Sequence, residues 1–156
     1  MKYKKYFLLL FLAFFFLWTS CEKDDVCLGA TTPKMVIRFY DYSQADIIKP
    51  TTELTVVALP SKDTLYKETA TDSIAIPLDP NQNFTEYIFI ENNNPDTLKI
   101  TYDLSPYFVS KACGYIMFFD QVSVEVNQDN DLWIKQIELI ENQIHIDTSA
   151  HVKIYH

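Results

Sequence analysis

The chain has 156 residues, of which 13 are Lys or Arg and 21 are Asp or Glu, so its formal net charge is −8. This acidic balance argues against nucleic acid as a partner, because nucleic-acid binding depends on Lys and Arg side chains that neutralise phosphate. The length suits one domain, and 48% hydrophobic residues suffice for a buried core.

The first twenty residues are typical of an export signal. Three lysines open the chain, an apolar run covers residues 7–18, and two small residues precede Cys21. The apolar run is shorter than the roughly 20 residues that a transmembrane helix requires. Small residues before a cysteine resemble the lipobox of bacterial lipoproteins, although Trp18 stands where leucine is usual. We expect removal of residues 1–20 and acylation, as with palmitate, of Cys21; the alternatives are a plain secretory signal and an uncleaved anchor.

Three charged residues follow soon after this cysteine. Lys23, Asp24 and Asp25 resemble the lysine-plus-two-acids signal that sends Bacteroidota lipoproteins to the outer face of the outer membrane. An ordinary hydrophilic tether is the other interpretation. One acyl chain binds a membrane only marginally, whereas the three chains expected at Cys21 anchor stably. The predicted location is therefore the outer membrane, at the cell surface rather than on the periplasmic face.

The remaining chain alternates short β-type segments with polar turns. The expected strands are residues 34–41, 52–59, 64–67, 73–78, 85–91, 97–104, 115–119, 121–127, 133–140, 143–146 and 151–155. Strand signals at this close and regular spacing indicate a single antiparallel β-sandwich, Ig-like or jelly-roll-like, with a partly open β-barrel as the alternative. A helix over residues 131–140 is the competing local interpretation. We thus expect a tether at residues 21–32 and an all-β domain at residues 33–156.

Three cysteines are present in all. With Cys21 acylated, Cys27 and Cys113 remain as a pair in an oxidising compartment, which predicts a disulfide between them. Two buried free thiols are the alternative, and the absence of Cys-x-x-Cys spacing argues against a redox pair. Loss of the first twenty residues removes three lysines and no acid, so ten basic and 21 acidic residues remain and the net charge becomes −11.

Residue types that carry chemistry show no catalytic spacing. Two glycines, Gly29 and Gly114, exclude a glycine-rich phosphate loop, and no Gly-x-Ser-x-Gly motif occurs. His145, Asp147 and His151 could meet at a metal if the last strands pair, but a solvent-facing His145 is the more ordinary interpretation. We expect no metal and no cofactor.

The other polar candidates have ordinary structural explanations. Arg38 is the chain's single arginine and lies in an apolar strand, which predicts a carboxylate partner or contact with a ligand carboxylate. The polar run 127–131 lacks the calcium-loop pattern and is expected to form a turn. Four glutamates lie on predicted strands without a pair suited to glycoside hydrolysis: Glu53, Glu86, Glu125 and Glu138.

Several segments together resemble an uncharacterised family of small Bacteroidota lipoproteins. They are CEKDDVC at residues 21–27, Thr32-Pro33 leading into VIRFYD at 36–41, TDSIAIPL at 71–78, ACG at 112–114 and AHVKI at 150–154. The resemblance runs nearly end to end through the mature chain. It implies an anchored all-β envelope protein, and it supplies no activity and no catalytic residues.

These features predict a lipid-anchored protein that catalyses no reaction. We expect it to serve as a binding or accessory module for an envelope protein partner, such as an outer-membrane barrel protein. The many aromatic residues keep open a second class, a surface lipoprotein that binds carbohydrate or a small ligand. A hydrolase is the third class and would need acids or a histidine that converge in a pocket.

Overall fold

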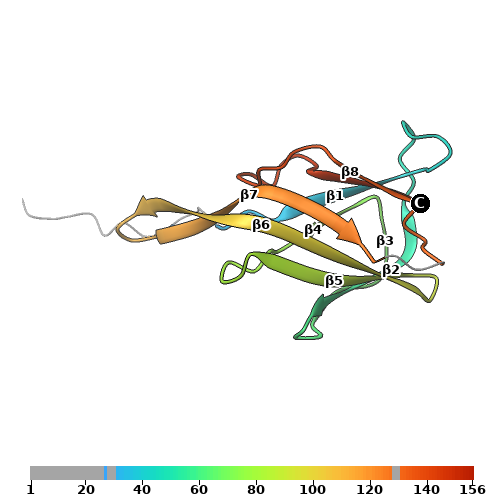
Figure 1. The fold of residues 1–156 in the computed structure, drawn as a ribbon, viewed down its shortest axis with the longest axis horizontal. Helices are drawn as coiled ribbons and strands as arrows, with labels where there is room; N and C mark the ends of the chain where they lie inside the picture. The colour runs from blue at the N-terminus through green and yellow to red at the C-terminus, as the bar shows by residue number, and fades with distance from the viewer. Residues whose placement is uncertain (1–26, 28–30, 128–130) are drawn as a thin grey trace, which may run out of the picture.

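Nine strands and no helix make up the part of the chain that the computed structural model describes, which is residue 27, residues 31–127 and residues 131–156 (Figure 1). The strands are β1 (Met35–Tyr40), β2 (Thr51–Leu59), β3 (Thr64–Thr71), β4 (Ser73–Ile76), β5 (Phe84–Glu91), β6 (Asn94–Ser110), β7 (Gly114–Val126), β8 (Gln136–Leu139) and β9 (Val152–Tyr155). The all-β prediction is confirmed. None of the described segments is a helix able to span a bilayer.

The strands form two sheets that pack face to face. One sheet has the order β4-β1-β9-β8 and the other the order β3-β2-β5-β6-β7, and neither closes on itself, so the predicted β-sandwich is confirmed. The pairing departs from the expected antiparallel pattern at one place. β9 lies parallel to β1, because the β8–β9 hairpin adds to the β1 edge of the sheet with its second strand innermost.

The core lies between the sheets and comes from alternate residues of each strand. Met35, Ile37 and Phe39 of β1 have no exposed surface, and Tyr87 and Phe89 of β5 face them from the other sheet. Each fully buried side chain of this size contributes roughly 1.5–3 kcal/mol to folding. The period-two pattern in the sequence thus corresponds to one buried face per strand.

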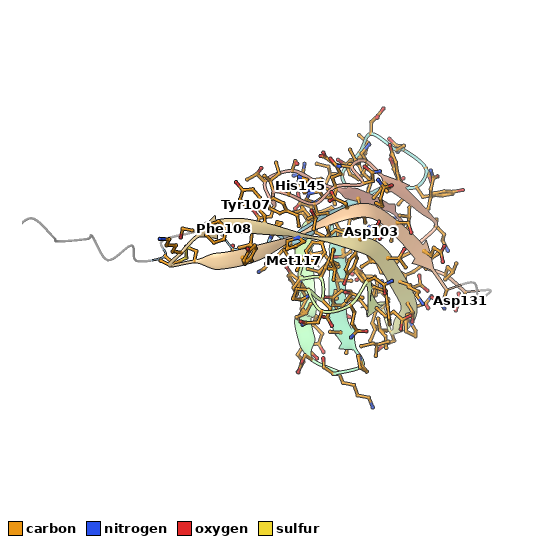
Figure 2. All side chains as sticks on the ribbon, turned by 60° about the vertical axis from the view of Figure 1, so that its left-hand side comes forward. Asp103, Tyr107, Phe108, Met117, Asp131 and His145 are labelled. Carbon is orange, nitrogen blue, oxygen red and sulfur yellow. A yellow bond between two sulfur atoms is a disulfide. The ribbon has the colours of Figure 1, made fainter. Side chains whose placement is uncertain are left out.

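The β6–β7 hairpin is much longer than the sandwich that it belongs to. β5 pairs with β6 only from Asn94 to Thr101, whereas the pairing with β7 continues to Ser110. The outer part of the hairpin projects from the body (Figures 1 and 2). We call residues 104–118 the hairpin arm. The predicted strand end at residue 104 is therefore wrong, and so is the break at residue 120, where β7 continues through a positive φ at Gln121.

Pro106 lies within β6, although proline is rare inside strands, so the sequence gives no sign that the strand continues there. Pro106 lies opposite Met117, and Met117 donates its N–H away from β6, to Oγ1 of Thr32 at 3.1 Å. In an antiparallel pair, two opposed residues direct their N–H groups either both toward or both away from the partner strand. The nitrogen of Pro106 therefore faces away from β7. β5 stops pairing at Thr101, so no described strand lies on that side and the missing N–H costs no ladder bond.

Two further strand predictions need correction near the C-terminus. Residues 143–146 form no strand; Ile144 makes an isolated bridge to Phe119 and is fully buried there. β8 begins at Gln136, later than predicted, because the segment before it turns inward to bury Trp133. The helix considered for residues 131–140 is absent, and all ten of these residues are described.

Candidate functional site

A disulfide joins Cys27, which precedes β1, to the turn at the end of the hairpin arm. Cys27 and Cys113 are bonded across a sequence separation of 86, with Cα atoms 5.0 Å apart, as predicted from the cysteine count. Cys113 lies in the turn between β6 and β7, where its N–H donates to Oγ of Ser110 at 3.0 Å. Gly114 follows with φ +70°, a conformation that side chains disfavour. The turn thus places Cys113 where it bonds to Cys27.

A second contact holds the same segment against the arm. The hydrogen bond from the N–H of Met117 to Thr32 lies along the free edge of β7, and Pro33 is buried beside the domain. The segment before β1 is therefore attached to the arm at two residues, Cys27 and Thr32. Cys21 and the charged residues Lys23, Asp24 and Asp25 lie outside the described residues.

Aromatic side chains cover both faces of the arm. On one face the rings of Tyr107 and Phe118 stack with centroids 5.1 Å apart, and on the other the rings of Phe108 and Tyr115 meet edge to face at 5.2 Å. Tyr107 is 53% exposed, Phe108 51% and Tyr115 69%, values unusual for side chains of this size. Figure 2 shows Tyr107 and Phe108 on the part of the hairpin that leaves the body. The arm is thus an exposed apolar surface.

The charges on the arm differ from those of the rest of the chain. Residues 104–119 contain no Asp or Glu and a single basic residue, Lys111, although the whole chain has 21 acids. Asp103 and Asp120 lie opposite each other in the register at the base of the arm. Asp120 also accepts a contact from Nε2 of His145 at 2.9 Å. A pair of carboxylates therefore marks where the acidic body ends and the acid-free arm begins.

The histidines considered for a metal site, His145 and His151, have separate environments. His145 is exposed and its ring stacks on Phe118 with centroids 4.5 Å apart. His151 is fully buried, and its Nδ1 accepts the N–H of Val36 at 3.0 Å, while burial lowers the pKa of its imidazole. Within the described ranges, no group of three or more His, Cys, Asp or Glu side chains is placed to hold a metal ion.

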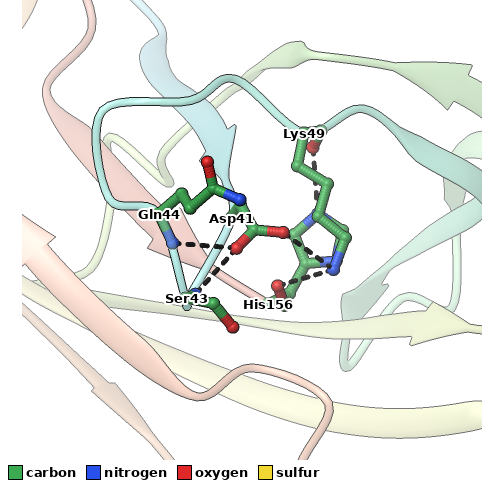
Figure 3. Close-up of polar contacts among 5 residues, drawn as sticks. All are labelled: Asp41, Ser43, Gln44, Lys49 and His156. Carbon is green, nitrogen blue, oxygen red and sulfur yellow. Dashed lines mark hydrogen bonds and ion pairs between the residues drawn. The ribbon is translucent and has the colours of Figure 1, made fainter.

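The third histidine belongs to a set of contacts that fixes a loop at the other end of the molecule (Figure 3). Oδ1 of Asp41 accepts the N–H groups of Ser43 at 2.7 Å and Gln44 at 2.9 Å, which shapes the turn. Nζ of Lys49 donates to the carbonyl of His156 at 2.8 Å, and Nε2 of His156 lies 3.0 Å from the carbonyl of Lys49. The histidine contacts backbone rather than a serine hydroxyl, so the set has the geometry of a loop clamp and not of a catalytic triad.

The predicted acidic candidates and the arginine are spread over both outer surfaces. Glu86 pairs with Lys99 at 3.4 Å on the five-stranded sheet, and Glu125 lies opposite that lysine in the register. Glu138 lies on the other sheet, 2.6 Å from the hydroxyl of Tyr155. That sheet also presents Arg38, beside Lys153 in the register, and among the described carboxylates Arg38 has no ion-pair partner.

Open cavities lie on the described surface. One of about 550 Å³ lies beside Trp133, and its lining includes His156, Glu91 and Asp131. Others of about 370 Å³ and 240 Å³ are lined in part by Glu86, the smaller one together with Lys99 and Glu125. In the largest of the three, Nε2 of His156 lies 3.0 Å from the carbonyl of Lys49 and Oε1 of Glu91 accepts the N–H of Thr52, so both side chains are held by backbone contacts. Glu53, the remaining glutamate candidate, is exposed on β2, and its N–H lies 3.4 Å from Oε2 of Glu91.

Comparison with known proteins gives one match. The pattern of a family of unknown function (DUF6452) matches residues 53–156. The chain belongs to this family. Membership of an uncharacterised family agrees with the resemblance noted in the sequence, while the lipoprotein character stays a prediction. The DUF6452 match includes the hairpin arm and Cys113 and begins after Cys27 and β1. No curated protein and no solved structure matches the chain.

Sequence reasoning missed the arm as a candidate site. The strands that it predicts at residues 97–104 and 115–119 do not include Pro106, through which β6 continues to Ser110. One signal was available in the sequence. Residues 104–119 carry eight aromatic or branched apolar side chains and no acid, although the chain as a whole is acidic. A hairpin that only faces water does not need this composition. Exposure itself depends on the absence of a partner strand, which the sequence does not show.

Proposed function

We propose that this protein is an exported, lipid-anchored module of the outer membrane that binds an envelope protein partner and catalyses no reaction. The observation that carries the proposal is the disulfide between Cys27 and Cys113. Structural disulfides belong to oxidising compartments outside the cytoplasm. This one ties the folded domain to a point six residues after Cys21, the residue that the export signal presents for acylation. The linkage supports a domain held close to its anchor.

The loop clamped by Asp41 is the surface that we assign to the protein partner. Residues 41–50, here the far loop, lie at the opposite end of the molecule from the arm (Figures 1 and 2). Tyr42 and Ile47 are more than half exposed there. The contacts of Asp41 and Lys49 hold the loop in one conformation before binding, which reduces the entropy lost on association. An anchored domain would present this end away from its own membrane attachment.

Mass analysis of the purified full-length product tests the anchor. We expect the mature chain to begin at Cys21 with diacylglycerol on its sulfur and an acyl chain on its amine. Cys21→Ser should shift the protein from the membrane fraction to the soluble fraction. A mature N-terminus elsewhere, or a chain without acyl groups, would refute the anchor. Protease treatment of intact cells, compared with cells whose protein carries Asp24→Ala and Asp25→Ala, tests surface location.

Affinity purification from detergent-solubilised membranes tests the partner. We expect an integral envelope protein to co-purify with the wild type, and expect Tyr42→Ser with Ile47→Ser to reduce its recovery at least tenfold. The matched control is Leu65→Ser, which removes an exposed apolar side chain from β3, outside the far loop. Recovery of no envelope protein, or equal loss in the control, would remove the proposal.

A second candidate function is carbohydrate binding by the exposed rings. Tyr115 is 69% exposed, and aromatic faces can stack on sugar rings. Against it, Phe108 and Tyr115 meet at an interplanar angle of 62°, so they do not form one flat platform. Isothermal titration with soluble polysaccharides separates the two candidates, because saturable binding that Tyr115→Ser abolishes would favour the second.

A further inference from the structure

We infer that the end of the hairpin arm inserts into the lipid interface of the membrane that holds the anchor. The inference rests on the proposed function, because it takes Cys21 as the acylated residue. Its occupant is the headgroup region of a phospholipid bilayer. Three independent observations on the arm point to this occupant: its distance from the anchor along the chain, its charge and the placement of its rings.

The length of chain before the structure sets the distance. Six residue steps separate Cys21 from Cys27, which span at most about 20 Å when fully extended. The Cα atom of Cys27 lies 5.0 Å from that of Cys113 in the turn of the arm. An acylated Cys21 therefore keeps the turn within about 25 Å of the bilayer surface whatever path the tether takes. The far loop, at the opposite end of the molecule, has no such constraint (Figure 1).

The charges of the arm suit a membrane surface and those of the body do not. The mature chain has a net charge of −11, and its acids make approach to anionic headgroups unfavourable. Residues 104–119 hold none of these acids, and Asp103 and Asp120 lie opposite each other in the register where the arm meets the body. Residues 104–119 can therefore contact anionic headgroups without repulsion from a carboxylate. Asp103 and Asp120 mark how far along the hairpin this holds.

The rings lie at the depth that interfacial binding requires. Ser110 opposes Gly114, and the next opposed pairs toward the body are Phe108 with Tyr115 and Tyr107 with Ile116. At about 3.3 Å per residue, these pairs occupy the last 10 Å of the arm. Interfacially bound segments bury their apolar side chains about 5–10 Å deep, and tyrosine is enriched at this level.

The single lysine of the arm limits the depth of insertion. Lys111 lies exposed in the turn, beyond the rings. Its ammonium group favours phosphate over hydrocarbon, and its long stem can pack along apolar surface while the charge stays among headgroups. The arm therefore enters obliquely, with the rings at the level of the headgroups, and does not cross the hydrocarbon core.

Fluorescence quenching by brominated lipid tests this inference on the full acylated chain. The vesicles contain phosphatidylethanolamine and phosphatidylglycerol whose acyl chains carry bromine near the headgroup. Trp133 is the single tryptophan after Cys21, and it is buried at the end of the domain away from the arm, so it supplies a constant background. The test variant is Tyr115→Trp and the matched control is Tyr42→Trp in the far loop; each exchanges one exposed ring for another.

We expect the emission added by Tyr115→Trp to shift to shorter wavelength and to be quenched at least threefold more than that added by Tyr42→Trp. Phe108→Trp repeats the measurement if the first variant unfolds at a lower urea concentration than the wild type. Equal quenching of arm and far-loop variants, in a protein that floats with the vesicles, would overturn the inference and leave the anchor standing. The mass of the purified protein shows whether it carries acyl groups. If it carries none, the proposed lipid anchor and this inference are both refuted.

Discussion

Replacement of both disulfide cysteines by serine should destabilise the domain without changing its fold. The bond between Cys27 and Cys113 closes a loop with a sequence separation of 86 in the unfolded chain. The chain-entropy relation then gives about 4.6 kcal/mol at 25 °C. The folded variant recovers part of this, because the residues before Thr32 are released from the arm when the bond is absent. We therefore expect the double variant to lose about 3 kcal/mol of unfolding free energy.

Urea unfolding followed by the fluorescence of Trp133 measures this loss. The indole is buried and donates to the carbonyl of Phe89 at 3.2 Å, so its emission reports the sandwich core rather than the arm. Reduction of the wild-type protein with dithiothreitol is the control and should give the same loss. A loss under about 1 kcal/mol in both experiments would refute the reasoning, since it would mean that the unfolded chain gains little freedom when the loop opens. A changed urea m-value would show instead that the compactness of the unfolded state had altered.

Three further predictions follow from buried polar groups and the turn. Burial lowers the pKa of His151 below 6.5, and its Nδ1 accepts the Val36 N–H, so the folded protein keeps this imidazole neutral. Stability should therefore fall as the pH drops below about 6.5, because the unfolded chain takes up a proton there that the folded chain does not. The substitution His151→Gln should flatten this part of the pH profile of the urea midpoint. Glu91 is buried, and its Oε1 accepts both the N–H and the hydroxyl of Thr52 at 2.8 Å. Glu91→Ala should therefore lower the free energy of unfolding by about 3 kcal/mol in the same assay. A decrease no larger than that caused by Thr52→Ala would contradict the role of the carboxylate. Gly114→Ala should cost about 1 kcal/mol through its positive φ, with Gly114→Asn closer to wild type, and equal values for the two variants would argue against a backbone cause.

The predictable parts of this fold are those decided by local pattern. The alternation of Met35, Ile37 and Phe39 places β1 correctly, because a strand with one buried face must repeat every two residues. The pairing of Cys27 with Cys113 followed from counting. Strand order did not follow, because it depends on non-local pairings such as Leu59 with Glu86. The parallel pairing of β1 with β9 did not follow either, because it joins residues more than a hundred positions apart.

The arm shows why the candidate site was harder to predict than the fold. Pro106 is read locally as a strand breaker, and it is tolerated only because β5 ends its pairing at Thr101. Likewise, Phe108 and Tyr115 look like core residues in the sequence and become surface residues because no second sheet covers the arm. Exposure of this kind depends on how the sheets assemble, so no periodic pattern of apolar and polar residues in the sequence reveals it.

The place of β9 in its sheet has a consequence for the order of folding. β1 has two neighbours, β4 and β9, and the register pairs Ile37 with Ile74 on one side and with Val152 on the other. The pairing with β4 closes a short loop, whereas the pairing with β9 must bring together residues 115 positions apart. One edge of β1 therefore stays open until residues 152–155 are in place, and an open edge is where a strand of another chain can add.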